Sequence, residues 1–515
     1  MPSKFFVTTP IYYTNGVPHI WHSYSSIIAD IIARYHRIKG EKVKFSTGVD
    51  ENSQKAISKA KEEGVEIVEY LDTMANVHKS VWDGLGIQYT DFIRTTEPRH
   101  HELVRKVLQK AWEKGDIYEW VYEWMYCIGC EAFKKEEDLI DKNGKKVCPD
   151  HLVEPEKLKE KNYFFRLSKY QDQLLKFYEQ HPDFVTPKER FNEVTEFVKR
   201  GLEDFSISRE TNKFWIKLPF DESQVTYVWY DALLNYVTVC VDETKPPTSW
   251  IPNLNSFWPA DLHIVGKDII RFHAIYWPAM LMAAQLELPK QILTTWFFTV
   301  NGQKISKSLG NVIDPVEYIH KYNKPLLVLY LLTAFHIGWD GDFDEKQSVL
   351  TYNSKLANNF GNLVNRVVVL SLKLTGELDG SVAWEVEWKL EKLKESFVWN
   401  IERYMLKDAL DSIFEFLDVI NKYVDTHAPW VMIKDEQKKE EVKKVLYTVA
   451  ESLRIVWILL YPFFPMKMSE MFRKLWLVDY EARLEKWEMN AIMSEIPSFV
   501  ITEKGEPLFQ RIEII

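Results

Sequence analysis

Glycine is scarce in this chain. Only 19 of the 515 residues are glycine, about half the usual share of roughly 7%, and tryptophan is equally frequent. With 46% hydrophobic and 27% charged residues, the chain is neither collagen-like nor disordered. The composition therefore predicts a globular protein, and the length predicts about three domains.

Long apolar runs, a secretory leader and a disulfide framework are also missing. The longest apolar runs, near 326–335 and 455–464, are shorter than a membrane span, and the N-terminus has no signal-peptide core. We therefore expect a soluble, cytoplasmic protein. Three of the four cysteines cluster between positions 127 and 148, which favours a metal site, and Cys240 is expected in the core.

The chain also has no excess of positive charge and no familiar phosphate-binding loop. Its net charge of −10 argues against nonspecific nucleic-acid binding but is compatible with a local basic face. Neither a P-loop nor a Gly-x-Gly-x-x-Gly motif follows the first predicted strand. If the protein binds a nucleotide, a segment of another kind must bind the phosphates.

Alternating strand and helix patterns predict an α/β fold, a doubly wound Rossmann-like domain interrupted by an insertion and followed by an all-α domain. The expected segments are 1–116 and 226–300 for the two halves of the Rossmann-like domain, 117–225 for the insertion, 301–354 for a lysine-containing region, 355–490 for the all-α domain and 491–515 for an irregular tail.

Two histidines open the first predicted helix. His19 and His22 stand three residues apart and share one helix face. A helix N-terminus attracts anions, and a histidine pair there can donate hydrogen bonds to a phosphate as charge builds on it. The alternative is a pair of partly exposed histidines without such a role.

A second candidate is the lysine loop, which we define as Asn301–Asn311. In it Lys304 and Lys307 flank Ser306 between two glycines. A mobile cationic loop of this kind can close on a polyphosphate and neutralise its leaving group. The same segment is also typical of a solvated surface turn.

The cysteine cluster has the spacing of a zinc site. Cys127-x-x-Cys130 is followed, after 17 residues, by Cys148-x-x-His151. Four protein ligands complete a tetrahedron and leave no position for water, so this Zn²⁺ would be structural. Chance clustering of reduced cysteines is the alternative.

Together, the histidine pair and the lysine loop resemble the two signatures of class I aminoacyl-tRNA synthetases, His-Ile-Gly-His and Lys-Met-Ser-Lys-Ser. Four further blocks resemble the methionyl-tRNA synthetase family: Thr8–Gly16, Thr47–Glu51, Tyr227–Tyr236 and Gly266–Leu281. The resemblance runs from about residue 4 to residue 480. It implies a class I synthetase catalytic domain with a zinc-knuckle insertion, a stem-contact region around the lysine loop, and an anticodon-binding helical bundle.

The resemblance also implies a reaction. Methionine attacks the α-phosphate of ATP, which gives methionyl-adenylate and pyrophosphate, and the methionyl group then passes to the terminal ribose of tRNA(Met). Catalysis would depend on His19, His22, Lys304 and Lys307, and ATP binding on these four and Ser306, with Mg²⁺ as counter-charge. The expected partners are tRNA(Met), L-methionine and ATP, without a membrane, and we expect a monomer.

For the amino-acid subsite, the resemblance implies that Asp50 binds the substrate ammonium. The residues implied around the substrate side chain are Ile11, Tyr13, Trp229, Ala232, Tyr236 and His273. Aromatic walls suit a thioether because it is apolar and polarizable. Without the family, Trp229 and Tyr236 would be equally typical of an aromatic core.

For the helical domain, the resemblance assigns reading of the anticodon CAU to Asn362, Arg366 and Trp430. Asn362 and Arg366 are four residues apart on one helix face, and Trp430 follows a helix break at Pro429. Proteins read RNA loops by stacking on aromatic side chains and by hydrogen bonds to base edges. An interhelix polar pair and a core tryptophan are the alternative.

Several residues depart from the family pattern. Asn52 and Ser53 replace the usual His-Gly, and five tryptophans stand where the family has glycine: Trp21, Trp120, Trp124, Trp215 and Trp296. An indole at Trp21, within the histidine signature, should block ATP, and each of the five should overpack its site. A coding cause is simpler: we hypothesise that the gene uses UGA for glycine and that these codons were translated as tryptophan.

Two other functions fit the sequence. A sister class I synthetase for another amino acid would be expected to lack the zinc knuckle combined with Trp229 and Tyr236. A noncatalytic tRNA-binding paralogue would keep the fold without binding ATP, as a genuine Trp21 predicts.

Overall fold

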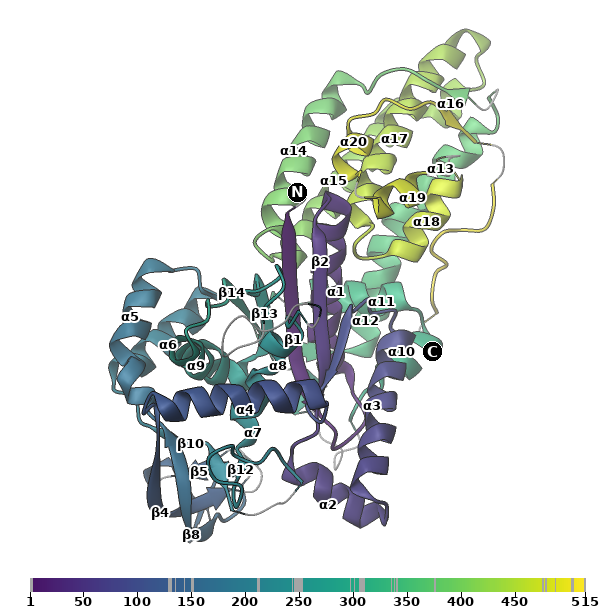
Figure 1. Ribbon diagram of the computed structural model, residues 1–515. Helices are drawn as coiled ribbons and strands as arrows, with labels where there is room; N and C mark the ends of the chain where they lie inside the picture. The colour runs from purple at the N-terminus through teal and green to yellow at the C-terminus, as the bar shows by residue number, and fades with distance from the viewer. Residues whose placement is uncertain are drawn as a thin grey trace.

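The computed structural model describes residues 3–513 except 128–131, 135, 143, 150–151, 211–213, 243, 245–252, 297, 301, 305–310, 335, 338, 340, 375–376, 475–476, 478, 487 and 502–503. Within this part of the chain, six strands form a parallel sheet in the order β3-β2-β1-β13-β14-β9 (Figure 1). Their bounds are Lys4–Tyr13 for β1, Lys42–Asp50 for β2, Asp91–Arg94 for β3, Val185–Thr186 for β9, Leu262–Gly266 for β13 and Gln291–Thr295 for β14.

The order of these strands places a topological switch point beside β1, the place where open α/β sheets have their ligand-binding crevice. On one side of β1 lie β2 and β3, which come early in the chain. On the other side lie β13 and β14, which come later. Loops leave the carboxyl ends of β1 and β13 in opposite directions, and this reversal is where ligands bind in open α/β sheets. The doubly wound architecture predicted from the sequence is therefore confirmed.

Helices cover the sheet, and the first two of them begin at side-chain caps, His19 and Ser53. The first connection is α1 (Ile20–Lys39), which ends at Gly40 in the left-handed conformation (φ 104°) that glycine adopts readily. The other helices of this domain are α2 (Gln54–Glu63), α3 (Ile67–Gly84), α4 (Pro98–Glu113), α7 (Val228–Leu233), α8 (Asn235–Thr238) and α9 (Trp277–Ala284). A turn of π-helix, Phe272–Tyr276, precedes α9.

The stretch expected as an insertion contributes to two sheets. An antiparallel sheet has the order β10-β8-β4-β5, and β6 pairs with β7 in a separate hairpin. From the same stretch, β9 joins the edge of the parallel sheet by pairing with β14. The bounds are Ile117–Cys127 for β4, Ala132–Lys134 for β5, Ile140–Lys142 for β6, Lys145–Val147 for β7, Glu156–Phe165 for β8, Phe205–Ser206 for β10, Gln171–Gln180 for α5 and Lys188–Lys199 for α6.

Short strands flank the second half of the sheet. The pair β11 (Ser208–Arg209) and β12 (Val225–Thr226) is antiparallel. A three-stranded sheet has the order β16-β15-β17, with bounds Gln303–Lys304, Phe298–Val300 and Gly341–Phe343. Two helices follow, α10 (Pro315–Lys321) and α11 (Lys324–Thr333).

The C-terminal part is a helical domain that extends away from the sheet (Figure 1). Its helices are α12 (Glu345–Tyr352), α13 (Asn362–Ser371), α14 (Trp384–Ile401), α15 (Leu406–His427), α16 (Pro429–Met432), α17 (Lys439–Leu460), α18 (Pro465–Lys474), α19 (Tyr480–Glu485) and α20 (Met489–Met493). A small pair, β18 (Glu377–Leu378) and β19 (Phe499–Val500), and a bond from the Asn353 side chain to the Ile512 carbonyl at 2.7 Å fasten the tail.

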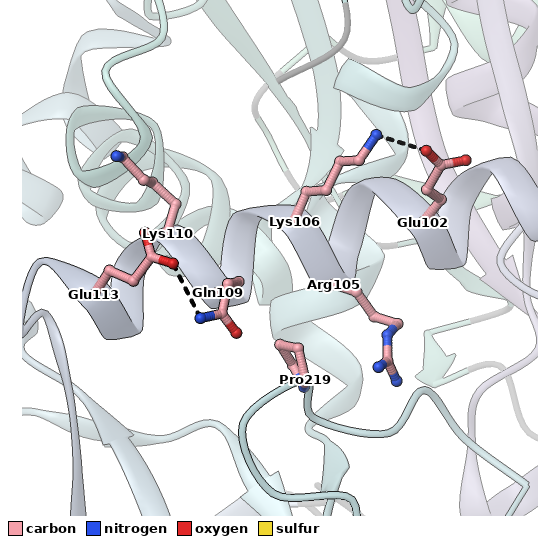
Figure 2. A pocket seen from close by; sticks show the side chains of 7 residues that line it. All are labelled: Glu102, Arg105, Lys106, Gln109, Lys110, Glu113 and Pro219. Carbon is pink, nitrogen blue, oxygen red and sulfur yellow. Dashed lines mark hydrogen bonds and ion pairs between the residues drawn. The ribbon is translucent and has the colours of Figure 1, made fainter. Parts of the chain in front are cut away.

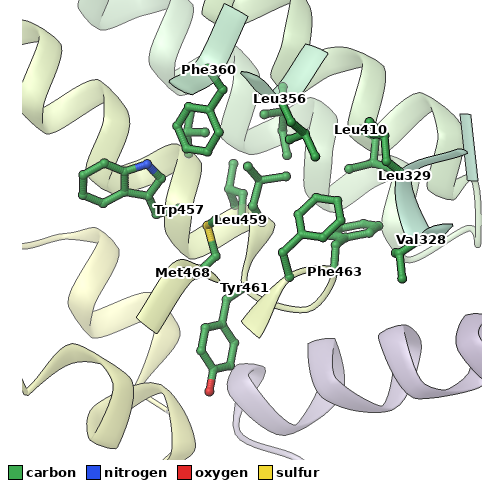
Figure 3. Close-up of a cluster of buried hydrophobic side chains, with 14 of the residues drawn as sticks. Val328, Leu329, Leu356, Phe360, Leu410, Trp457, Leu459, Tyr461, Phe463 and Met468 are labelled. Atoms are coloured by element: carbon green, nitrogen blue, oxygen red, sulfur yellow. The ribbon is translucent and has the colours of Figure 1, made fainter. Parts of the chain in front are cut away.

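One hydrophobic core joins this helical domain to the domain with the parallel sheet. Leu329 of α11, Phe360 of the π-helical segment Asn353–Gly361 and Trp457 of α17 belong to the same buried cluster (Figure 3), which also includes residues of α1. Cys240 is fully buried, as the sequence predicts. None of the described helices is both long enough and apolar enough to cross a membrane.

Candidate active site and RNA-binding face

Three predicted site residues meet at the carboxyl ends of β1 and β2. In the register of this pair, Tyr13 lies opposite Asp50 and Ile11 lies opposite Gly48. A Cβ atom at Gly48 would lie 2.1 Å from the carbonyl oxygen of Ile93 in β3, so only glycine fits where β2 pairs with β3. The pairing of β1 with β2 holds Asp50 beside Tyr13 at the end of β1.

The two histidines lie together at the start of α1. The backbone N–H of His19 donates to Nδ1 of His22 at 3.1 Å, the N–H of Trp21 donates to Nδ1 of His19 at 3.4 Å, and the ring centroids are 4.1 Å apart. Because each Nδ1 accepts, the hydrogen of each neutral ring is on Nε2. The pair thus caps the helix and keeps N–H donors suited to an anion.

Trp21 lies beside this pair. Its ring centroid is 6.3 Å from that of His19, with planes inclined by 28°, and the half-buried indole packs against the main core. Trp21 lies in the first turn of α1 and is not among the residues with positive φ, so its backbone conformation does not require glycine. Glycine at this position would instead leave more space beside the histidines.

The chain after the lysine loop returns to the same helix end. The N–H of Ile20 donates to the carbonyl of Ile313 at 3.0 Å. Within the loop, Lys304 ends β16 and pairs with Thr299. The side chain of Lys304, and all of Ser306 and Lys307, lie outside the described residues. The described backbone therefore brings the segment that follows the loop to the histidine pair, as expected if the two motifs share a site.

The other predicted residues of the amino-acid subsite lie on the side of β1 opposite to β2. The Tyr13 and Trp229 ring centroids are 6.5 Å apart, and the hydroxyl of Tyr236 lies 2.8 Å from Nε2 of His273. Tyr236 and His273 are buried, and Ala232 lies one helical turn before Tyr236. Burial lowers the pKa of His273 to about 4, so its imidazole is neutral at pH 7.

Sequence reasoning missed two residues of this subsite. Phe272 stacks on Trp229 with ring centroids 3.9 Å apart. Asp231 is buried and accepts from the side chain of Asn52 at 2.7 Å, while the N–H of Asn52 donates to Asp50 at 3.3 Å. Asn52 therefore links two buried carboxylates. The only sequence signals were their positions, one within the Tyr227–Tyr236 block and one beside His273.

Two of the four predicted zinc ligands are described. Cys127, at the end of β4, and Cys148 are both fully buried. The N–H of Leu152 donates to the carbonyl of Cys148 at 2.7 Å. Cys130 and His151 lie outside the described residues, and no group of three potential metal ligands occurs among the residues that are described.

The predicted anticodon residues lie on one exposed face of the helical domain. Asn362 and Arg366 are exposed on α13, and the guanidinium of Arg366 lies 5.7 Å from the ring centroid of Trp430. Arg366 also pairs with Asp425 of α15 at 3.0 Å, which is the interhelix contact of the alternative interpretation. Trp430 is 40% exposed and is therefore not a core residue.

The other tryptophans at family glycine positions have varied surroundings. Trp120 is 61% exposed on β4, and Trp215 is buried. Trp296 is buried under Arg190, whose guanidinium lies 4.1 Å from the ring centroid. The side chain of Trp124 lies outside the described residues. None of the five has a positive φ, so strain does not identify them as glycines.

A separate surface hollow runs along α4 and contains none of the predicted site residues (Figure 2). Along the helix, Lys106 pairs with Glu102 at 2.5 Å, whereas Arg105 pairs with Glu222 outside it at 3.4 Å. The hollow is lined by Glu102, Arg105, Lys106, Gln109, Lys110, Glu113 and Pro219.

Comparisons with known proteins agree with this arrangement. The family model of class I tRNA synthetases (M) matches residues 5–368. The methionine–tRNA ligase of Caldanaerobacter subterraneus is 41% identical over 100% of this chain and 80% of its own length, and that of Thermotoga maritima is 40% identical over 99% and 80%. The structure of Mycobacterium tuberculosis methionyl-tRNA synthetase with methionyl-adenylate superposes with a TM-score of 0.92, at 33% identity, over 99% of this chain and 100% of that chain.

Proposed function

The chain belongs to the methionyl family of class I tRNA synthetases, and from this premise we propose that it joins L-methionine to tRNA(Met) through a methionyl-adenylate intermediate. One observation carries the proposal. Asp50, the aromatic subsite that includes Trp229 and the histidine pair of α1 all contact Tyr12 or Tyr13 at the carboxyl end of β1. A carboxylate suits the ammonium of an amino acid, and a histidine pair suits a phosphate.

In the first step, Asp50 holds the ammonium and Tyr13, Trp229 and Phe272 enclose the substrate side chain. The methionine carboxylate attacks the α-phosphate, the bond to the β-phosphate breaks, and pyrophosphate leaves. The Nε2–H groups of His19 and His22 stabilise the charge that builds on the phosphate. Lys304 and Lys307, with Ser306, close on the leaving phosphates, and Mg²⁺ supplies counter-charge when ATP is bound.

The second step uses the helical domain. Arg366 and Trp430 can stack on bases of the anticodon loop, and Asn362, one turn earlier, can hydrogen-bond a base edge. Zinc would be held by Cys127, Cys130, Cys148 and His151 and would fasten the insertion without entering the reaction. We also propose that the protein is a monomer and that the reaction takes place in the cytoplasm.

The five tryptophans at glycine positions belong to this proposal. We retain the hypothesis that they are encoded by UGA and read as glycine in the native host. UGG codons at these positions, or a native protein mass that matches five tryptophans, would contradict it.

Methionine-dependent exchange between ATP and pyrophosphate tests the proposal. Two proteins are compared, one with tryptophan and one with glycine at the five positions. We expect methionine to stimulate exchange in the glycine form. Stimulation by leucine, valine or cysteine instead would indicate a sister synthetase. Tight tRNA binding without exchange in either form would indicate a noncatalytic paralogue.

A further inference from the structure

The buried side-chain amide of Asn52 joins the segment after β2 to α7. Its Nδ2 donates to Oδ2 of Asp231 at 2.7 Å and to the carbonyl oxygen of Thr95 at 3.4 Å. A carboxylate and a backbone carbonyl both accept, and this fixes which end of the amide faces them. Asn52 and Asp231 are both buried and come from different halves of the domain with the parallel sheet. The proposed reaction gives Asn52 no role.

The helix that Asn52 bonds also carries part of the amino-acid subsite. Trp229 and Ala232 belong to α7, as Asp231 does. The ring centroid of Trp229 lies 6.5 Å from that of Tyr13 at the end of β1. Residues two apart on a helix do not share a face, so Trp229 and Asp231 contact the strand ends at two separate places. These two contacts together fix α7 against the ends of β1 and β2.

The segment after β2 is fixed on its other side as well. The N–H of Glu51 donates to Oγ1 of Thr95 at 2.9 Å, in the connection that follows β3. The N–H of Asn52 donates to Oδ1 of Asp50 at 3.3 Å. The carboxylate to which the proposed function gives the substrate ammonium is therefore part of the same short segment as Asn52. A shift of this segment relative to α7 would move that carboxylate too.

We propose that Asn52 is a positioning residue, because its bond to Asp231 fixes the spacing between the two ends of the amino-acid subsite. Asp50 lies at the ammonium end and Trp229 at the side-chain end. A subsite of fixed length can distinguish methionine from a homologue that is one methylene longer, a difference worth about 10- to 200-fold in other enzymes. This inference rests on the proposed function, which places Asp50 and Trp229 in the subsite.

Asn52→Ala tests the proposal because it removes the donor and leaves the rest of the segment unchanged. Amino-acid binding is measured by calorimetry without ATP, so the outcome does not depend on Trp21. We expect methionine binding to weaken about tenfold, which corresponds to about 1.4 kcal/mol. The preference for methionine over ethionine, which is one methylene longer, should shrink. A variant that keeps this preference, whatever its affinity, would overturn the positioning role.

An exchange of the two side chains tests the bond itself. The double variant Asn52→Asp/Asp231→Asn keeps one amide, one carboxylate and the net charge, and the amide then donates in the opposite direction. We expect its methionine affinity to lie within about threefold of the parent and its preference over ethionine to be restored. A double variant that binds methionine no better than Asn52→Ala would overturn the proposal.

Asn353→Ala is the matched control. Asn353 is also buried, and its amide donates to the carbonyl of Ile512 at 2.7 Å in the helical domain. The substitution therefore removes a buried asparagine donor with a bond of the same length outside the subsite. Methionine affinity and the preference over ethionine should change by less than about twofold. Equal losses in Asn353→Ala and Asn52→Ala would assign the effect to general destabilisation and overturn the proposal.

Failure of the proposed function gives a different result. If the parent binds another amino acid but not methionine, the assignment of the substrate is wrong. The same variants are then measured with that amino acid and with its homologue that is one methylene longer. A loss of preference in Asn52→Ala that the exchanged pair restores would still support the positioning role, and an unchanged preference would overturn it.

Discussion

At the scale of single residues, Trp21 bears most directly on the proposed chemistry. It lies one helical turn or less from both histidines of the pair, and its indole is inclined by only 28° to the ring of His19. If ATP binds at the histidines as proposed, a planar group in this position occupies space that the nucleotide needs. The helical backbone accepts either residue, so the effect of Trp21 is one of volume and not of strain.

Trp21→Gly should therefore create or restore ATP binding. We expect ATP affinity measured by calorimetry to rise at least about tenfold, which is about 1.4 kcal/mol of binding free energy. Glycine also lowers the stability of the helix, by roughly 1 kcal/mol, and this smaller cost falls on folding and not on binding. Trp120→Gly is the control, because it makes the same substitution at an exposed position on β4. Equal ATP affinity in the parent and in Trp21→Gly would show that the indole does not obstruct the nucleotide.

At the scale of elements, the sequence predicts the helices and strands whose apolar residues recur at a regular spacing. The alternating strands and helices of the doubly wound sheet are predictable because each buries a periodic apolar face. Strand β9 is not, since its two residues join the sheet edge only through pairing with β14, which is far away in sequence. The π-helical turn at Phe272–Tyr276 also escapes prediction, and it is this turn that sets Phe272 against Trp229.

The contacts of the site divide in the same way, into those that motif spacing predicts and those that depend on the tertiary fold. Motif spacing predicts the contact between His19 and His22, because a helix brings residues three apart together. The link between Asn52 and Asp231 joins residues 179 positions apart and follows only from the packing of α7 against the strand ends. Ser53 is explained locally: its side chain accepts from the N–H of Ala56 and caps α2.

The zinc knuckle can be tested as an element. Cys127→Ala should lose the single zinc ion expected per chain, because three ligands hold the metal less tightly and admit water. Elemental analysis of the purified protein measures the metal content. Cys240→Ala also removes a fully buried cysteine, but from the catalytic domain, and should keep its zinc. A parent protein without zinc, or equal zinc in both variants, would contradict the site.

At the scale of the whole molecule, the helical domain separates two functions. Its near end contacts the catalytic domain where Glu402 accepts from Tyr35 and Lys39 of α1, at 3.2 and 2.5 Å. From there α15 runs for 22 residues, about 33 Å, to the far end, where α16 follows with Trp430 in it (Figure 1). The proposed RNA-reading face and the proposed adenylate site thus lie far apart, with the length of α15 between them.

This separation predicts that Arg366→Ala affects tRNA and not methionine. The substitution removes a guanidinium that lies over Trp430 and can stack on a base, so affinity for tRNA(Met) should fall about tenfold and discrimination against a tRNA with another anticodon should shrink. Methionine affinity should stay within about twofold, since no contact described for Arg366 reaches the crevice.

Arg403→Ala is the matched control for this measurement. The guanidinium of Arg403 lies 3.2 Å from the ring centroid of Trp399, so the variant removes an arginine–tryptophan contact of the same kind from the same domain. It does so beside Glu402, at the end of the bundle nearest the catalytic domain. Both variants are measured by filter binding at the same salt concentration, because loss of any positive charge weakens RNA binding somewhat. If both lose tRNA affinity equally, the loss reflects charge alone, and the face around Trp430 does not read the anticodon.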